Sequence, residues 1–278
     1  MRLGFVGLGQ MGAPMAAHLA GPGLLVHDTR PEAVAPLVKA GARAARSVAE
    51  VAAHAEVVSV MVRDDDQVRE VAAEVLASAR AGTVLAVHST IGAHTAEELA
   101  ERAAPYGIEV VDAPVSGGFM GASAGSLAVM AGGSAEAFAR CREPFGAWAD
   151  LVLHMGPVGA GTRAKLARNL LHFVAFAAAA EAQRLAEAAG VPLRRLGRVV
   201  RHTDAITGGP GAIMLRPTTA PLAGDDGLRD VMRHVRALGE KDLALALDLA
   251  GELGVDTPLA RIALDRLAAG LGLEDDDG

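Results

Sequence analysis

The segment GAGTRAKLARNLL, residues 159–171, places a lysine and an asparagine four residues apart, at Lys165 and Asn169. Residues with this spacing lie on one face of a helix. A lysine in the first turns of a helix meets the positive end of the helix dipole, which disfavours the charged amine and lowers its pKa. Such an amine can exchange protons near neutral pH. Lys165 is therefore a candidate general acid and base, although most lysines on helices are simply solvated.

A second candidate region is DAPVSGGFMGASAGSLAVMAGG, residues 112–133, which follows an apolar run. Its glycine content predicts a loop rather than the core of a strand or helix. Ser116, Gly117 and Gly118 could offer a hydroxyl and successive backbone N–H groups to a substrate carboxylate. An ordinary glycine-rich connection is the alternative.

The third candidate is GFVGLGQMG, residues 4–12, which follows a short apolar run and precedes a helix expected to begin near Met11. In a strand-to-helix turn of this kind, Gly7 allows the tight turn, Gly9 lets a pyrophosphate approach, and Gly12 lets helix and strand pack closely. A glycine-rich turn without a ligand is the alternative, since the chain has 33 glycines.

Asp28 ends the next apolar run, about 20 residues beyond the glycines, where a carboxylate can accept hydrogen bonds from the adenosine ribose. This favours NAD as the cofactor, because the same carboxylate would repel the phosphate of NADP. Arg30 leaves NADP possible, since a guanidinium could stack on adenine or pair with that phosphate.

The elements that must position these residues change character along the chain. Up to about residue 154, apolar runs at 3–7, 24–28, 56–62, 83–90 and 108–115 alternate with Ala-rich helical stretches, which predicts a parallel, doubly wound α/β sheet. Thr95 followed by Glu98 forms a capping-box pattern at one helix start. Beyond residue 160 the pattern is helical, over 162–190, 193–202, 228–253 and 258–267. We therefore expect a Rossmann-type domain over 1–160 and an all-α domain over 161–278, joined by a long helix.

Composition narrows the class of protein. The formal net charge is −7, which argues against nucleic acid and anionic membranes as partners. The single cysteine, Cys141, is expected to be buried and inert, and the histidines show no metal-ligand spacing. With no secretion signal and no apolar run long enough to span a bilayer, we expect a cytoplasmic protein without a bound metal.

Four motifs together carry a resemblance to a known family. GFVGLGQMG, the DAPVSGG segment, GAGTRAKLARN and KDLALALDLA occur in the order and spacing of the β-hydroxyacid dehydrogenases, the group of 3-hydroxyisobutyrate dehydrogenase and tartronate semialdehyde reductase. The chain resembles this family over nearly its full length. The resemblance implies hydride transfer between NAD(P) and a small carboxylate substrate, and a homodimer or homotetramer that buries the long helix.

The resemblance also implies roles for individual residues. Lys165 matches the catalytic lysine, Asn169 its partner, and Ser116, Gly117 and Gly118 the loop that binds the substrate carboxylate. On the cofactor, Lys241 matches a lysine at the nicotinamide end and Thr90 a threonine near the nicotinamide ribose. The remaining residues implied to bind the cofactor are Gly7, Gly9, Gln10, Met11, Gly12, Asp28, Thr29, Arg30, Val62 and Arg63.

The chain departs from the family pattern at several positions. Arg168 stands where an asparagine is common, and could bind a second anionic group of the substrate or form an ion pair facing outward. Arg63 replaces a proline beside the cofactor, and residues 201–240 match poorly, so the substrate is left open. Reduction of C=N bonds, as in the related imine reductases, and a non-catalytic nucleotide-binding scaffold are the alternatives; retention of Lys165 argues against both.

Overall fold

A computed structural model of the protein describes residues 1–273. The chain divides into two compact units, Met1–Arg168 and Asn169–Gly278. Each unit has its own architecture.

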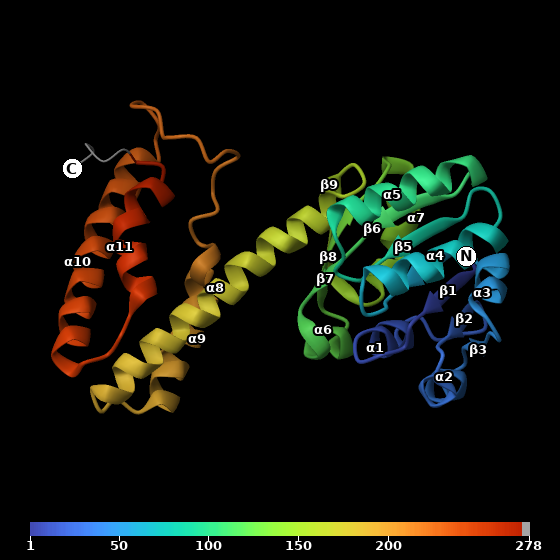
Figure 1. The fold of residues 1–278 in the computed structure, drawn as a ribbon, viewed down its shortest axis with the longest axis horizontal. Coiled ribbons are helices and arrows are strands. Elements are labelled where there is room, and N and C mark those ends of the chain that lie inside the picture. The colour runs from blue at the N-terminus through green and yellow to red at the C-terminus, as the bar shows by residue number, and fades with distance from the viewer. Residues whose placement is uncertain (274–278) are drawn as a thin grey trace. The chain divides into compact units, whose positions relative to one another are not determined.

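The first unit is built on a mixed but mainly parallel sheet (Figure 1). Its order is β3-β2-β1-β4-β5-β6-β8-β7, with β9 paired to β8; the strands up to β6 are parallel, and β8 is antiparallel to β6 and β7. The described strands are β1 Leu3–Val6, β2 Leu24–His27, β3 Arg43–Ala44, β4 Val57–Val60, β5 Val84–Val87, β6 Glu109–Asp112, β7 Val115–Ser116, β8 Leu127–Gly132 and β9 Ala149–Gly156. The central strands β4 and β5 are buried along their whole length, as continuous apolar runs in a doubly covered sheet must be.

Helices cover both faces of this sheet. They are α1 Gly12–Ala17, α2 Pro31–Lys39, α3 Val48–His54, α4 Asp65–Ser78, α5 Ala93–Ala103, α6 Gly118–Ala124 and α7 Ala135–Gly146. One apolar cluster joins the sheet to α1, α2, α6 and α7, and a second joins it to α3, α4 and α5. This two-sided arrangement confirms the predicted doubly wound α/β fold.

The segment 112–133 is more ordered than its glycine content predicts. It contains β7, α6 and β8 rather than one loop. Most of its glycines lie at element boundaries: Gly117 precedes α6, Gly125 follows it with φ +71°, and Gly132 ends β8, whereas Gly121 lies within α6. Between them, β8 alternates buried and half-buried residues, as a strand does. The prediction of a loop was therefore wrong for most of this segment.

The predicted capping box at Thr95 was also wrong. Helix α5 begins at Ala93, so Thr95 lies inside its first turn. The Thr95 hydroxyl donates a hydrogen bond to Oδ1 of Asp65 at 2.5 Å and accepts one from Nη2 of Arg69 at 3.0 Å. The Thr95 hydroxyl therefore links α5 to α4 and does not cap its own helix.

A buried histidine lies in the core of the first unit. His88 is 1% exposed, and its ring packs against Phe145 and Trp148 with centroid distances of 5.0 and 5.1 Å. Its Nδ1 is 2.9 Å from the carbonyl oxygen of Ala113, and its Nε2 is 3.1 Å from Oγ of Ser59. Burial lowers the pKa of His88 to about 4, so the ring is neutral at neutral pH.

In the described part of the second unit the regular elements are all helices, and a long irregular segment separates α9 from α10. Helix α8, Ala160–Ala188, begins in the first unit and ends in the second; α9 Leu193–Thr207, α10 Arg229–Leu253 and α11 Pro258–Gly270 follow, and α10 and α11 lie side by side (Figure 1). Glu181 of α8 accepts hydrogen bonds from the N–H groups of Leu259 and Ala260, at 3.0 and 3.2 Å, and so caps α11. None of the helices in residues 1–273 combines the length and apolar character needed to cross a membrane.

Candidate functional site

The glycine turn between β1 and α1 has a different requirement at each glycine. Gly7 has φ +90°, and a Cβ there would lie 2.3 Å from the carbonyl oxygen of Met61. A Cβ at Gly12 would lie 2.0 Å from the carbonyl oxygen of Gly7. A Cβ at Gly9 would have no protein atom within 4 Å. Gly7 and Gly12 are thus required by the turn itself, whereas Gly9 keeps open the space in front of it.

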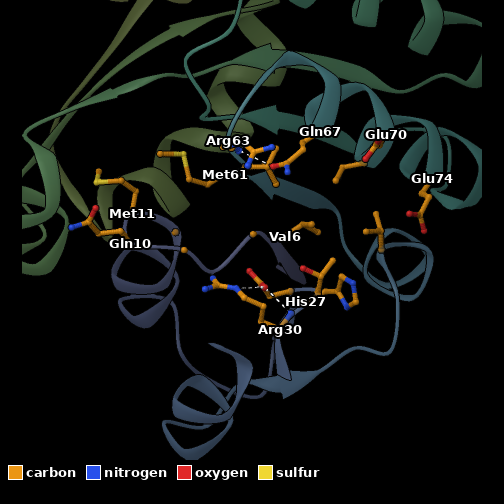
Figure 2. Close-up of a pocket in the computed structure, with 18 residues that line it drawn as sticks. Val6, Gln10, Met11, His27, Arg30, Met61, Arg63, Gln67, Glu70 and Glu74 are labelled. Atoms are coloured by element: carbon orange, nitrogen blue, oxygen red, sulfur yellow. Dashed lines mark hydrogen bonds and ion pairs between the residues drawn. The ribbon is translucent and has the colours of Figure 1, made fainter. Parts of the chain in front are cut away.

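That space belongs to a cavity of about 680 Å³ above the carboxyl ends of β1, β2 and β4 (Figure 2). Ten of the residues predicted to bind the cofactor line it: Gly7, Gly9, Gln10, Met11, Gly12, Asp28, Thr29, Arg30, Val62 and Arg63. The structure therefore brings together predicted residues from three separate stretches of the sequence. Thr90 and Lys241 are not among the lining residues.

Asp28 links the glycine turn to the end of β2. Its Oδ2 accepts a hydrogen bond from the N–H of Leu8 at 2.7 Å, and its Oδ1 accepts from the N–H and Nε of Arg30 at 2.9 and 3.3 Å. Burial by itself would raise the pKa of Asp28, but these hydrogen bonds and the Arg30 charge bring it below the ordinary value. A carboxylate is therefore held, charged, at the edge of the cavity.

The loop after β4 forms the opposite side of the cavity. The N–H of Val62 donates to Oγ of Ser89 at 2.9 Å, and that hydroxyl donates back to the carbonyl oxygen of Val62 at 2.8 Å. Arg63 pairs with Asp64 at 2.9 Å and is 79% exposed. Figure 2 shows Arg30 and Arg63 on opposite sides of the cavity.

One wall of this cavity is formed by residues that the sequence did not predict to bind the cofactor. Gln67, Glu70, Val71 and Glu74 line it from one face of α4. Their spacing of three and four residues is the signal that places them on a common face. Nothing local in the sequence connects that face to the glycine turn, because the connection arises from the neighbouring positions of β1 and β4 in the sheet.

The cavity fits a dinucleotide on structural grounds. In α1 the N–H of Ala13 donates to the carbonyl oxygen of Gly9 at 3.1 Å and Pro14 has no N–H, so the donors for a pyrophosphate would be the N–H groups of the glycine turn that precedes them, beside the open position at Gly9. The charged Asp28 stands one strand away, at the end of β2. Phosphate-binding donors and a ribose-binding acceptor are therefore present together.

Lys165 forms a hydrogen bond with Ser116. Its Nζ lies 2.9 Å from Oγ of Ser116, and the lysine is 8% exposed. The pKa of Lys165 is lowered to about 8, mainly because burial penalises the charged amine and also because the Arg168 guanidinium is near. The direction of this shift agrees with the prediction, but burial is its principal cause. The pair joins α8 to β7, two elements that are distant in sequence.

The two glycines after Ser116 have backbone conformations that favour glycine. Gly117 has φ +129° and Gly118 has φ +61°. A Cβ at Gly117 would also lie 2.8 Å from Cδ2 of Leu127. The SGG sequence therefore makes a tight turn beside the Lys165 amine, with Gly118 exposed at its outer edge.

The remaining predicted residues lie elsewhere. Thr90 is exposed just after β5. Asn169 follows Lys165 by one helical turn on α8 and is the first residue of the second unit. Lys241 lies on α10, where its Nζ is 3.0 Å from Oδ1 of the neighbouring Asp242.

Comparison with known proteins places this geometry in context. Residues 2–156 match the family described as the NAD binding domain of 6-phosphogluconate dehydrogenase. An uncharacterized oxidoreductase from Mycobacterium tuberculosis is 57% identical over 281 residues, covering 99% of this chain and 95% of that protein. The structure of a protein from Mycobacterium avium 104, described as an oxidoreductase, is 54% identical with a TM-score of 0.94, covering 98% of this chain and 99% of that one.

Two further structures differ in what they show. A 3-hydroxyisobutyrate dehydrogenase from Mycobacterium tuberculosis, solved with L-serine, is 35% identical with a TM-score of 0.67, covering 98% of this chain and 95% of that one. An imine reductase from Streptomyces aurantiacus has a TM-score of 0.75 at 20% identity, covering 98% of this chain and 95% of that one. At that level of identity the likeness shows a common fold and nothing about activity.

In residues 1–273, no group of His, Cys, Asp and Glu side chains is arranged to hold a metal ion.

Proposed function

The chain belongs to the β-hydroxyacid dehydrogenase family, an NAD-binding group of oxidoreductases, and on that premise we propose that Lys165 is its catalytic acid and base and that a short β-hydroxy acid is its substrate. The observation that carries the proposal is the buried Lys165 amine, 2.9 Å from the Ser116 hydroxyl and with a pKa of about 8. A structural lysine gains nothing from burial, because burial penalises its charge. A proton-transfer group needs that shift.

Each residue has a distinct part in this proposal. NAD, when bound, supplies the hydride chemistry at its nicotinamide. In oxidation, the neutral Nζ of Lys165 accepts the proton of the substrate hydroxyl; in reduction, the ammonium form donates it. Ser116 accepts a hydrogen bond from Lys165, which leaves its own hydroxyl proton to donate to the substrate carboxylate, together with the N–H groups of Gly117 and Gly118. Asn169, one turn beyond Lys165, orients the lysine and the substrate.

We infer a preference for NAD over NADP from Asp28. Its charged carboxylate stands at the end of β2, where the 2′-phosphate of NADP would meet it. Arg30 pairs with that carboxylate and so has part of its charge offset. Asp28→Asn removes the negative charge, and we expect it to lower the ratio of kcat/KM for NAD to that for NADP at least tenfold.

The first test is the initial rate with NAD and with NADP over 3-hydroxyisobutyrate, glycerate, 3-hydroxypropionate, 4-hydroxybutyrate and serine. We expect a clear preference within this panel, and loss of turnover in Lys165→Ala with NAD binding intact. Wild-type levels of turnover in Lys165→Ala would refute the role of the lysine. Tight NAD binding without turnover on any acid, aldehyde or imine would support a scaffold instead.

We also infer that the protein is a homodimer or homotetramer. Leu170, Phe173, Val174 and Phe176 are 50–70% exposed on α8 within the second unit. A contiguous apolar helical surface of this kind is typical of a subunit contact. Light scattering on the purified protein tests this proposal, and a monomer at micromolar concentration would contradict it.

A further inference from the structure

Asp112 is a fully buried carboxylate with no part in the proton transfer described above. It ends β6 and has 0% exposure. Its Oδ1 accepts a hydrogen bond from the N–H of Gly159 at 2.7 Å, and its Oδ2 accepts one from the N–H of Thr162 at 2.6 Å. Burial raises the pKa of Asp112 above its ordinary value, against the effect of these two hydrogen bonds. Burial of a carboxylate costs free energy, so a contribution to structure or function must offset that cost at Asp112.

The two glycines that border Asp112, Gly132 and Gly161, have no room for a side chain. A Cβ on Gly132 would lie 2.4 Å from Oδ1 of Asp112, and a Cβ on Gly161 would lie 2.5 Å from its carbonyl oxygen. Gly161 would also meet the carbonyl oxygen of Met130 at 2.3 Å. The first turn of α8 is therefore packed directly on the ends of β6 and β8.

Both partners of the Lys165–Ser116 hydrogen bond are tied to this contact. Lys165 follows Thr162 by less than one turn of α8, so fixing the N–H of Thr162 fixes the base of the lysine side chain. Ser116 follows Asp112 by four residues along the main chain, on β7. The Asp112 side chain thus binds the start of α8, while its main chain continues within four residues into β7, which carries Ser116.

We propose that Asp112 is a positioning residue, whose buried carboxylate holds the start of α8 against β6 and thereby keeps the Lys165 amine buried beside Ser116. The inference rests on the proposed function of Lys165 but concerns a property that the apo protein already has. If the anchor is lost, the lysine reaches solvent and its proton affinity returns toward that of an ordinary lysine.

The test measures the pKa of Lys165 directly, without a substrate. Competitive acetylation over a pH series, with the Lys165 peptide quantified by mass spectrometry, is carried out on the wild-type protein and on Asp112→Asn. Asparagine keeps the size of the side chain but can accept at only one of the two atoms. We expect the pKa to move upward from about 8 toward 10.5 in this variant. An unchanged or lowered value would overturn the proposal, since loss of the Asp112 charge alone would act downward.

Two further variants complete the design. Ser47→Ala removes the cap of α3, where the Ser47 hydroxyl accepts from the N–H of Glu50 at 3.2 Å, and should reduce stability without moving the Lys165 pKa. If Asp112→Asn does not fold, Thr162→Pro removes one of the two N–H donors at a position in the first helical turn, where proline is tolerated. We expect the same upward direction, and no shift would again overturn the proposal.

The dehydrogenase assay separates failure of this inference from failure of the proposed function. With the pKa raised, the oxidation rate of Asp112→Asn at pH 7 should fall by tenfold or more, because less of the lysine is neutral. If the Lys165 pKa is raised in Asp112→Asn but the wild-type protein has no dehydrogenase activity, the anchoring role of Asp112 is supported and the proposed function is refuted. If the Lys165 pKa is unchanged in Asp112→Asn and the wild-type protein is an active dehydrogenase, the proposed function is supported and the anchoring role is refuted.

Discussion

The proton-transfer role proposed for Lys165 predicts how the reaction rate depends on pH. A lysine with a pKa of about 8 is about 9% neutral at pH 7, whereas one with the ordinary pKa of 10.5 would be about 0.03% neutral. Burial of this amine therefore increases the base available for oxidation roughly 300-fold at pH 7. For oxidation, kcat/KM should rise about tenfold per pH unit below the pKa and become constant above it. For reduction, which needs the ammonium form, the rate should fall above the same pKa.

The assay follows NADH formation and consumption at 340 nm over a pH series, with saturating cofactor and limiting substrate. Lys165→Arg is the informative variant, since it keeps a positive charge but cannot lose a proton at these pH values. We expect oxidation to be lost and the pH dependence to disappear with it. Opposite slopes for the two directions, with one shared inflection near or below 8, would agree with the reasoning; an inflection near 10.5, or one that persists in Lys165→Arg, would refute it.

Three further predictions concern other parts of the first unit. Gly9→Ala should leave thermal stability unchanged, since its Cβ meets no protein atom, but should weaken NAD binding at least tenfold because the Cβ enters the cavity. Gly12→Ala should lower the melting temperature, because its Cβ would lie 2.0 Å from a carbonyl oxygen. Calorimetry measures the effect on stability and NAD titration the effect on binding. The pKa of His88 is about 4 in the folded protein, below its ordinary value of 6.5. Between these two pH values the unfolded chain binds more protons than the folded protein. The free energy of unfolding should therefore fall by about 3 kcal/mol as the pH drops from 6.5 to 4. Urea unfolding at several pH values checks this, and His88→Gln should remove that part of the pH dependence. Arg168→Asn should raise the pKa of Lys165, because the guanidinium disfavours the charged amine, and an unchanged pH–rate profile would contradict that coupling.

The sequence was most informative where a local pattern has a single structural solution. Continuous apolar runs predicted β1, β2, β4, β5 and β6, because strands buried on both faces need such runs. The long helix and its three successors followed from helical periodicity and from glycine and proline at their ends. The glycine turn and Asp28 were found together because their spacing reflects one strand–helix–strand unit.

The features that the sequence did not predict depend on contacts between distant segments. β8 was missed because glycines at its boundaries concealed an alternating run. Thr95 was given a capping role that its contact with Asp65 excludes. The cause of the Lys165 pKa shift is burial beside β7, which no local property of α8 reveals. Asp112 was part of a quoted motif, but its hydrogen bonds to Gly159 and Thr162 span about fifty residues of chain.

The packing of Trp148 against His88 has a consequence for experiments on this protein. Trp148 is the only tryptophan in the sequence, and it lies in the core of the first unit, so its fluorescence reports on that unit alone. Far-ultraviolet circular dichroism, by contrast, is dominated by helices present in both units. Denaturation curves from the two signals would coincide only if both units unfold in one cooperative transition. Comparing Trp148 fluorescence with circular dichroism on the wild-type protein would thus show whether the two units unfold independently.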